Sequence, residues 1–403
     1  MIVQSLLRRH FLINKSKKSI RVDEEILAED INGKVIVTLN RPRTLNALNI
    51  SMVRKLYPIL KVLRMKDACF YGTYFLYSER FITSTPLRPA AHVDHLIYFK
   101  HCNGNPNVPF IFVKGAGGKA FCAGGDIIAV SRSAQANDPS NTIYKDFFRE
   151  QYTMNHLIGE LKVPYIAVMD GITMGGVTTE RTILAMPETA IGLFPDVGGT
   201  FFLSRLPYNL GQFMALTGYR VIGADVYHMG LATHFVPSEK LKDLEDELLR
   251  TDNKLLSTGK IDHILNKYHV KENEIPNFGL EKRLAQIDHM FSGSTVESIF
   301  KKLRNNGDDF GRKQFNILSM KSPTSLKVTF RQLQIGLKMQ FHEVFTMEYR
   351  LSQRFMKNHD FHEGCRAILI DKDQKPNWKP TSIEEISDEM MDEYFAPFKK
   401  VKN

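Results

Sequence analysis

The sequence predicts an α/β fold, in which strands and helices alternate in a core and a helical region follows towards the C-terminus. Short β-branched runs alternate with segments of helical periodicity up to about residue 225, and the rest of the chain is mainly helical in its periodicity. Two of the strand-like runs end in glycine-rich turns. The composition, with 43% hydrophobic and 24% charged residues among 403, excludes collagen-like, disordered and disulfide-scaffold proteins.

The first predicted elements are a strand and a helix. Residues 34–39 are rich in β-branched side chains and precede a turn at residues 40–43. Residues 48–60 carry apolar side chains at helical spacing, and Ser51 is a candidate N-cap. Residues 64–102 are rich in aromatic side chains and fit neither period. We interpret that stretch as an atypical insertion, which is either a helical or membrane-facing excursion or sequence foreign to the native protein.

Two further strands are expected before glycine-rich turns. Residues 108–113 lead into the loop at 114–119, and residues 163–169 lead into 170–176. The first loop has neither P-loop nor dinucleotide-binding spacing, and Ala123–Asp126 opens a predicted helix. Backbone N–H groups at two such turns can donate to one carbonyl oxygen, as acyl transfer requires when an oxyanion develops. Glycines that serve the turns alone are the alternative interpretation.

Two carboxylates lie in surroundings that are poor in solvent. Glu188 and Asp196 are flanked by apolar residues, prolines and glycines. Such surroundings disfavour the ionised carboxylate, which suits a general acid or base. The alternative for Asp196 is a turn residue before Val-Gly-Gly.

The net charge of +10 is concentrated at the N-terminus. Residues 1–21 contain six Lys or Arg and no acid, with leucine and phenylalanine at roughly helical spacing. This pattern is typical of a mitochondrial transit peptide, which we place at residues 1–28; a basic tail is the alternative. No stretch approaches the roughly 20 apolar residues of a membrane span, so we expect no membrane association. The four cysteines have no metal-binding or disulfide-framework spacing.

Several motifs together resemble the crotonase (enoyl-CoA hydratase/isomerase) superfamily. They are LNRPRTLNAL at residues 39–48, KAFCAGGD at 119–126, GITMGG at 171–176 and MPETAIGLFPDVGG at 186–199. Within that superfamily, the last motif is similar to the 3-hydroxyisobutyryl-CoA hydrolase family, as are SPTSLK at 322–327, TMEYRLS at 346–352 and residues 360–378.

The resemblance implies a fold, an activity and a set of site residues. The fold is a spiral of ββα units at residues 29–225, and the helical region at 226–403 takes part in contacts between copies of the chain. The activity is hydrolysis of an acyl-CoA thioester in valine catabolism in the mitochondrial matrix, with the CoA thioester as substrate and no cofactor or metal. The implied residues are Gly125 and Gly176 as oxyanion-hole donors, Glu188 and Asp196 as catalytic carboxylates, and Gln151, Gly176, Glu188, Asp196, Ala47 and Leu48 as substrate contacts.

The resemblance leaves the roles of the carboxylates open. Glu188 either activates water or attacks as a nucleophile, and Asp196 either orients the substrate hydroxyl or moves a proton. Gln151 stands where the family carries a second acid, so it can form hydrogen bonds but carries no charge. Asn46, Ala47 and Leu48 are expected along the pantetheine tunnel, with a plain helix-entry turn as the alternative.

The segment after Gly176 departs from the family pattern. It is about ten residues shorter, which removes roughly three turns of the helix that would direct the Gly176 N–H and contribute its dipole. We therefore predict a weakened or inactive oxyanion hole in this chain. Two other functions stay open on the sequence. One is an enoyl-CoA hydratase/isomerase, and the other is a non-catalytic, RNA-binding protein of the same fold, whose binding would weaken steeply with salt.

Overall fold

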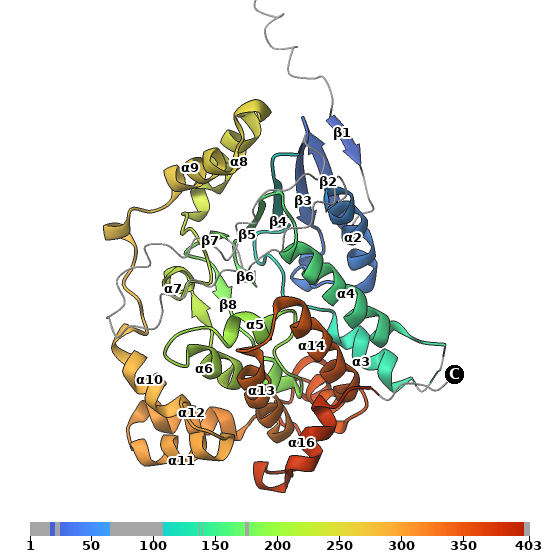
Figure 1. Cartoon of the computed structure of the whole chain (residues 1–403), viewed down its shortest axis with the longest axis vertical. Helices are drawn as coiled ribbons and strands as arrows, with labels where there is room; N and C mark the ends of the chain where they lie inside the picture. Colours follow the sequence, from blue (N-terminus) through green and yellow to red (C-terminus); the bar gives the residue numbers. More distant parts are fainter. Residues whose placement is uncertain are drawn as a thin grey trace, which may run out of the picture.

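The computed structural model describes residues 17–20, 25–64, 108–136, 138, 140–173 and 177–398. Strands and helices alternate through the first half of this part of the chain, and helices fill the second half (Figure 1). The mixed α/β architecture predicted from the sequence is therefore confirmed. Most of the leader at residues 1–28 and most of the insertion at 64–102 lie outside the described residues.

The larger sheet contains six strands in the order β1-β2-β3-β4-β5-β7. β1 to β3 are antiparallel neighbours, and β3, β4, β5 and β7 pair in parallel. β1 and residues 26–28 of β2 fall inside the stretch expected to be the leader. The bounds are β1 Lys17–Ile20, β2 Ile26–Ile31, β3 Lys34–Leu39, β4 Ile111–Gly115, β5 Tyr165–Met169 and β7 Val177–Thr178.

The parallel register brings the two glycine turns to one edge of this sheet. Val35 pairs with Ile111, and Ile111 pairs with Tyr165, so that β3, β4 and β5 end side by side. The loop after β4 then contacts the turn after β5 through a bridge between Ala120 and Ile172. This edge of the sheet consequently holds the candidate functional residues.

A smaller sheet follows, and the segment after Gly176 contributes β8 to it and β7 to the larger sheet. It has the order β6-β8-β9, with β6 at Ile172–Thr173, β8 at Ile183–Leu184 and β9 at Val221–Ile222. Described residues 177–187 form a strand, a turn and a second strand and contain no helix. The turn is tied to the end of β5 because Thr179 donates to Asp170 Oδ1 at 2.9 Å. A 3₁₀ turn, η3, at Glu188–Ile191 follows directly.

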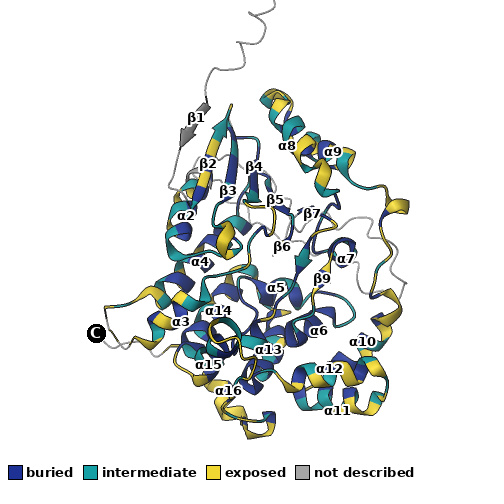
Figure 2. Cartoon of the chain, turned by 180° about the vertical axis from the view of Figure 1, so that it is seen from behind, coloured by how far each residue is buried: buried dark blue, intermediate teal, exposed yellow. Residues whose placement is uncertain are grey.

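The helices lie around these sheets and build the C-terminal region. Buried residues concentrate in α5, α6 and α13, whereas α8, α9, α11 and α12 each expose one face (Figure 2). Their bounds are α2 Ile50–Arg64, α3 Ile127–Gln135, α4 Ile143–Gly159, α5 Gly199–Leu203, α6 Leu210–Thr217, α7 Ala224–His228, α8 Leu241–Arg250, α9 Thr258–Tyr268, α10 Leu284–Phe291, α11 Val296–Asn306, α12 Asp309–Ser319, α13 Pro323–Gly336, α14 Phe341–Phe355, α15 His359–Gly364 and α16 Asp388–Phe395.

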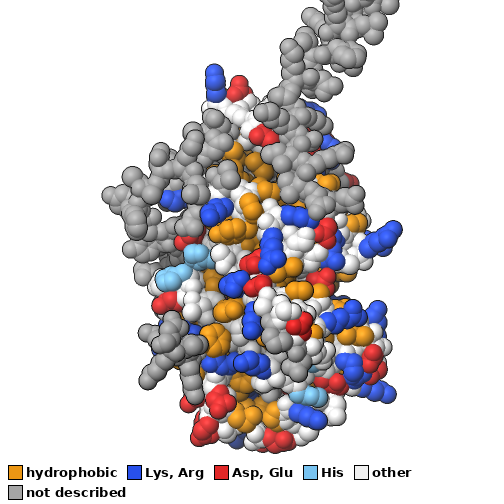
Figure 3. All heavy atoms as spheres, turned by 90° about the vertical axis from the view of Figure 1, so that its right-hand side faces the viewer, with side chains coloured by type: hydrophobic (Ala, Val, Ile, Leu, Met, Phe, Trp, Pro, Cys, Tyr) orange, Lys and Arg blue, Asp and Glu red, His pale blue; other side chains and the backbone are white. Residues whose placement is uncertain are grey.

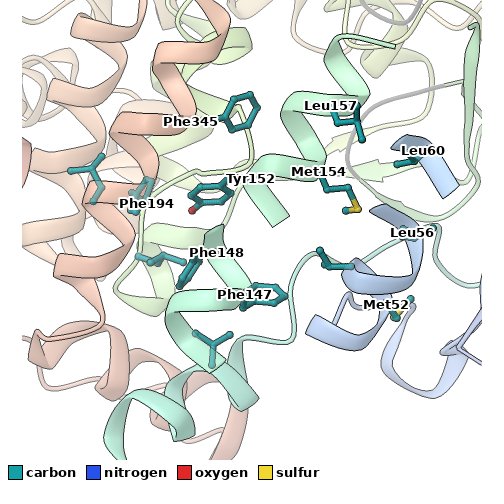
Figure 4. Packing of buried hydrophobic residues seen from close by; sticks show 14 of the residues in the cluster. Met52, Leu56, Leu60, Phe147, Phe148, Tyr152, Met154, Leu157, Phe194 and Phe345 are labelled. Atoms are coloured by element: carbon teal, nitrogen blue, oxygen red, sulfur yellow. The ribbon is translucent and has the colours of Figure 1, made fainter. Parts of the chain in front are cut away.

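The core beside the glycine turns joins the first half of the chain to the C-terminal helices. Met52 and Leu56 of α2 face Phe147 and Met154 of α4, and Tyr152 on the same helix lies near Phe345 of α14 (Figure 4). The Tyr152 and Phe345 rings are 6.3 Å apart. Packing of aromatic rings at this range fixes α4 between the two parts.

Two expected elements are found, and one expected helix cap is not. The strand at residues 34–39 is found with those bounds, and the helix opened by Ala123–Asp126 begins at Ile127 with Asp126 as its N-cap. The cap of the preceding helix was predicted wrongly. Ser51 lies inside α2, and Asn49 caps it, because its Oδ1 accepts from the Met52 N–H at 2.8 Å.

Candidate active site

A cavity of about 900 Å³ opens at the edge where β3, β4 and β5 end. That volume is in the range of pockets that take a small ligand or part of a larger cofactor-like molecule. Its wall is mainly apolar and includes residues from α2, α4 and the two glycine turns. Six of the expected site residues line it: Ala47, Leu48, Gly125, Gln151, Glu188 and Asp196.

The turn at Gly125 is fastened to the entry of α2. Leu48 donates to the Gly124 carbonyl at 2.8 Å, and Asp126 donates to the Leu48 carbonyl at 2.8 Å. This bridge uses the N–H groups of Leu48 and Asp126, so the Gly125 N–H takes no part in it. A side chain at Gly125 would place Cβ 2.8 Å from Phe147 Cζ, so only glycine fits without movement. The turn is therefore a rigid candidate donor site.

Asn46 supports the neighbouring turn and does not line the cavity. Its side chain is buried and donates to the carbonyls of Ala116 at 3.0 Å and Ala120 at 2.8 Å. It also has a φ of 58°, which asparagine tolerates better than most residues. The expectation that Asn46 lines a tunnel is wrong for this residue, whereas Ala47 and Leu48 do face the cavity.

Glu188 is a buried carboxylate at the start of η3. The residue is 8% exposed, and its Oε2 has no protein hydrogen-bond partner. Burial, reinforced by the negative charge of Asp196, raises the pKa of Glu188 well above the ordinary value. A carboxylate oxygen without a protein partner, facing a cavity, is available to a substrate or a water molecule.

Asp196 shares the cavity with Glu188 and has a partner. The Tyr152 hydroxyl donates to Asp196 Oδ2 at 2.7 Å. Burial raises the pKa of Asp196 to about 6, although the hydrogen bond from Tyr152 opposes the shift. Both pKa values are raised, but Asp196 has a hydrogen-bond donor and Glu188 Oε2 has none, so the two carboxylates can take different acid and base roles.

Tyr152 was not identified from the sequence, although Gln151 beside it was. Both residues lie on α4 and both are buried. The one pattern that pointed to Tyr152 was the aromatic spacing with Phe148, which is equally typical of core packing. Arg220 and Lys321 also line the cavity and were not identified either.

Neither a cysteine nucleophile nor a metal site is supported by the described residues. Burial raises the pKa of the Cys122 thiol to about 11, so little thiolate forms at neutral pH. Within the described ranges, no group of three or more His, Cys, Asp and Glu side chains could hold a metal ion. The second expected donor, Gly176, lies outside the described residues.

The surface carries charges of both signs. Lys and Arg side chains are interspersed with Asp and Glu on the face seen in Figure 3. On that face the positive charge of the described residues forms no continuous patch of the kind that binds nucleic acid. Among the helices that the structure describes, none is both long and apolar enough to cross a membrane.

Comparison with known proteins gives one consistent result. A family model described as enoyl-CoA hydratase/isomerase matches residues 94–395. A mitochondrial 3-hydroxyisobutyryl-CoA hydrolase of Xenopus laevis is 46% identical over 374 residues, which is 90% of this chain and 86% of the relative. The mitochondrial 3-hydroxyisobutyryl-CoA hydrolase of Homo sapiens is 43% identical over 385 residues, covering 92% of this chain and 88% of the relative.

Solved structures agree at the level of the fold. A carnitinyl-CoA dehydratase from Mycobacterium thermoresistibile has a TM-score of 0.76 at 29% identity, covering 94% of this chain and 98% of that structure. An enoyl-CoA hydratase from Rhodobacter sphaeroides has a TM-score of 0.73 at 27% identity, covering 93% of this chain and 98% of that structure.

Proposed function

The chain belongs to the enoyl-CoA hydratase/isomerase family and, within it, to the 3-hydroxyisobutyryl-CoA hydrolases, and from this premise we propose how it hydrolyses the thioester of 3-hydroxyisobutyryl-CoA. The products are free CoA and 3-hydroxyisobutyrate, and the reaction is a step of valine catabolism. The observation that carries the proposal is the pair Glu188 and Asp196, two buried carboxylates on the wall of one cavity.

Binding of the acyl group brings its carbonyl to the Gly125 turn. The Gly125 N–H then donates to the thioester oxygen, and this bond strengthens as the oxygen becomes negatively charged. Gly176 supplies the second donor in the proposed arrangement. Ala47 and Leu48 contact the pantetheine arm from the apolar wall.

Glu188 acts on the thioester carbon from the same cavity. Its raised pKa makes the ionised form a stronger base than an ordinary carboxylate, which favours removal of a proton from an attacking water. Direct attack by the carboxylate would pass through an anhydride that water then opens. Both routes require ionised Glu188, so both predict activity that rises with pH until Glu188 has lost its proton.

Asp196 faces the hydroxyl end of the substrate. Tyr152 occupies Oδ2, so Oδ1 is the atom that accepts from the substrate hydroxyl. Gln151 of α4 also lines the cavity and offers a further hydrogen bond without adding another carboxylate beside Glu188 and Asp196. A site built to bond a hydroxyl discriminates strongly against acyl groups that lack one.

The surroundings of the reaction follow from the same premise. Both of these relatives are named mitochondrial, and the acid-free basic stretch at residues 1–21 supports import, so the protein acts in mitochondria, in our proposal in the matrix. The carboxylates and the N–H donors suffice for thioester hydrolysis, so we propose that no metal or cofactor is needed. We also propose that the C-terminal helices form contacts between copies of the chain.

The test is release of free CoA thiol from 3-hydroxyisobutyryl-CoA by the purified chain. Glu188→Gln keeps the size of the side chain and removes its basicity, and we expect kcat to fall by at least about a hundredfold. Hydration of crotonyl-CoA is measured on the same preparations, because a hydratase would act on it. Thiol release that depends on Glu188 supports the hydrolase. Crotonyl-CoA hydration without thiol release would make the chain a hydratase, and no turnover of either by the folded protein would contradict the proposed mechanism.

A further inference from the structure

The turn that carries Asp196 has an unfavourable backbone conformation, and side chains of α4 and α13 form hydrogen bonds to it. Val197 has a φ of 53°, a left-handed conformation that β-branched residues rarely adopt. Such a backbone persists only where surrounding contacts over-determine it. Asn155 of α4 donates to the Val197 carbonyl at 3.4 Å, and Gln332 of α13 donates to the Pro195 carbonyl at 2.6 Å.

The strongest of these contacts comes from Glu348 on α14. Its Oε2 accepts from the Gly198 N–H at 2.8 Å. Its Oε1 accepts from Thr200 twice, from the N–H at 3.1 Å and from the hydroxyl at 2.6 Å. The Thr200 hydroxyl also accepts from Gln332, so the chain of bonds runs from α13 through Thr200 to Glu348. These hydrogen bonds favour the ionised carboxylate, whereas burial is the larger effect and raises the pKa of Glu348 to about 8.

Glu348 makes these bonds without reaching the substrate. It is fully buried, and it is not among the residues that line the cavity. All three of its hydrogen bonds go to the residues that follow Asp196 and begin α5. Removing such an acceptor leaves two buried backbone N–H groups without a partner, and the turn must then rearrange to satisfy them.

We propose that Glu348 is a positioning residue, which holds the turn so that Asp196 faces the substrate. The inference rests on the proposed role of Asp196 and adds to it a requirement for the C-terminal helices. Glu348 is 152 residues beyond Asp196 in the sequence. A helix of the C-terminal region, α14, therefore completes a site whose other proposed residues lie in the first half of the chain. The ionisable groups that face Asp196 are Tyr152, Glu188 and Glu348.

Two substitutions at different ends of the same bonds test the proposal. Glu348→Gln keeps the shape, but the amide NH₂ must point at one of the two backbone N–H donors. Thr200→Val removes the hydroxyl with little change of volume, and Thr200→Ser restores it. Asp225→Asn serves as the control, because Asp225 also accepts a backbone N–H, from Gly279 at 2.9 Å, and does not line the cavity.

Three measurements are made on each full-length variant: kcat and KM for 3-hydroxyisobutyryl-CoA, the pH profile, and amide hydrogen exchange of peptides that cover residues 195–203. We expect Glu348→Gln and Thr200→Val to lower kcat by about tenfold to a hundredfold with KM within about threefold. We expect exchange at residues 198–200 to become faster in both. Thr200→Ser and Asp225→Asn should stay within about threefold of the original kcat.

The outcomes separate this inference from the proposed function. Faster exchange at residues 198–200 with unchanged kcat in a folded Glu348→Gln variant would overturn the positioning role. Unchanged exchange would overturn the anchoring itself. If the unaltered chain hydrolyses no 3-hydroxyisobutyryl-CoA, the proposed function fails, and the exchange data still decide whether Glu348 holds the turn.

Discussion

Replacing Asp196 by asparagine should make the protein more stable and inactive at the same time. The asparagine side chain keeps an oxygen that accepts from the Tyr152 hydroxyl, so the contact now made by Oδ2 is retained. The substitution removes a charge that burial opposes, since burial raises the pKa of Asp196 from 3.8 to about 6. Ionisation of Asp196 in the folded protein therefore lowers the free energy of unfolding.

The sign and size follow from proton linkage. Between about pH 4 and about pH 6 the folded state binds more protons at Asp196 than the unfolded state, so stability falls as pH rises through this window. A shift of about two pKa units corresponds to roughly 3 kcal/mol of lost stability, which is complete above about pH 7 and absent at low pH. The Asp196 charge also raises the pKa of Glu188 and of Glu348, so its removal lowers the pKa of both groups.

Urea denaturation of the original chain and of Asp196→Asn at several pH values measures the difference. We expect it to grow from near zero at about pH 4 to roughly 3 kcal/mol at about pH 8, in favour of the variant. Asp246→Asn is the control. Its hydrogen bond with Lys242 lowers the pKa of Asp246, so this substitution should bring no gain at the higher pH. A difference that does not change with pH, or a more stable original chain at the higher pH, would refute the reasoning.

Two further predictions concern the same cavity. Tyr152→Phe removes the hydrogen bond that lowers the pKa of Asp196, so the contribution of Asp196 to the acid limb of the kcat/KM profile, beside that of Glu188, should move to higher pH; an unmoved limb would mean that Glu188 sets it without Asp196. Gly125→Ala brings a Cβ to 2.8 Å from Phe147 Cζ and displaces the Gly125 N–H, so thiol-release assays should show kcat lower by about tenfold to a hundredfold. Adding Phe147→Leu should restore part of the lost kcat. An unchanged kcat in Gly125→Ala alone would show that Gly125 is not an oxyanion-hole donor.

The parts of the fold that could be predicted are those set by local pattern. The strand at residues 34–39 and the helix that begins after Asp126 follow from β-branched runs and a capping residue, and the structure has both. The start of α2 was misjudged because Asn49 and Ser51 are both good caps two residues apart. The hydrogen bond from the Met52 N–H to Asn49 Oδ1 identifies the cap, and the sequence does not contain it.

The candidate site was predictable where a motif carries its residues and not where distant elements meet. Glu188 and Asp196 lie in one motif, and the structure places both on one cavity. Glu348 lies in another motif whose sequence shows no role, because its partners Gly198 and Thr200 are 150 and 148 residues away. The raised pKa values of Glu188 and Asp196 also depend on burial and on the separation of charges, which a sequence does not contain.

The segment after Gly176, which we expect from the sequence to be shorter than in the family, makes these distant supports more important. Described residues 177–187 contain no helix, so no helix there directs its N-terminus and favourable dipole at the substrate oxygen. Gly125 is the expected oxyanion donor that lies within the described residues, and Phe147 of α4 packs against it. The same helix supplies Tyr152 to Asp196, and α14 supplies Glu348 to the next turn. We therefore expect activity to depend on how firmly α4 and α14 hold Gly125 and Asp196, and the variants at Phe147, Tyr152 and Glu348 test that dependence at three different contacts.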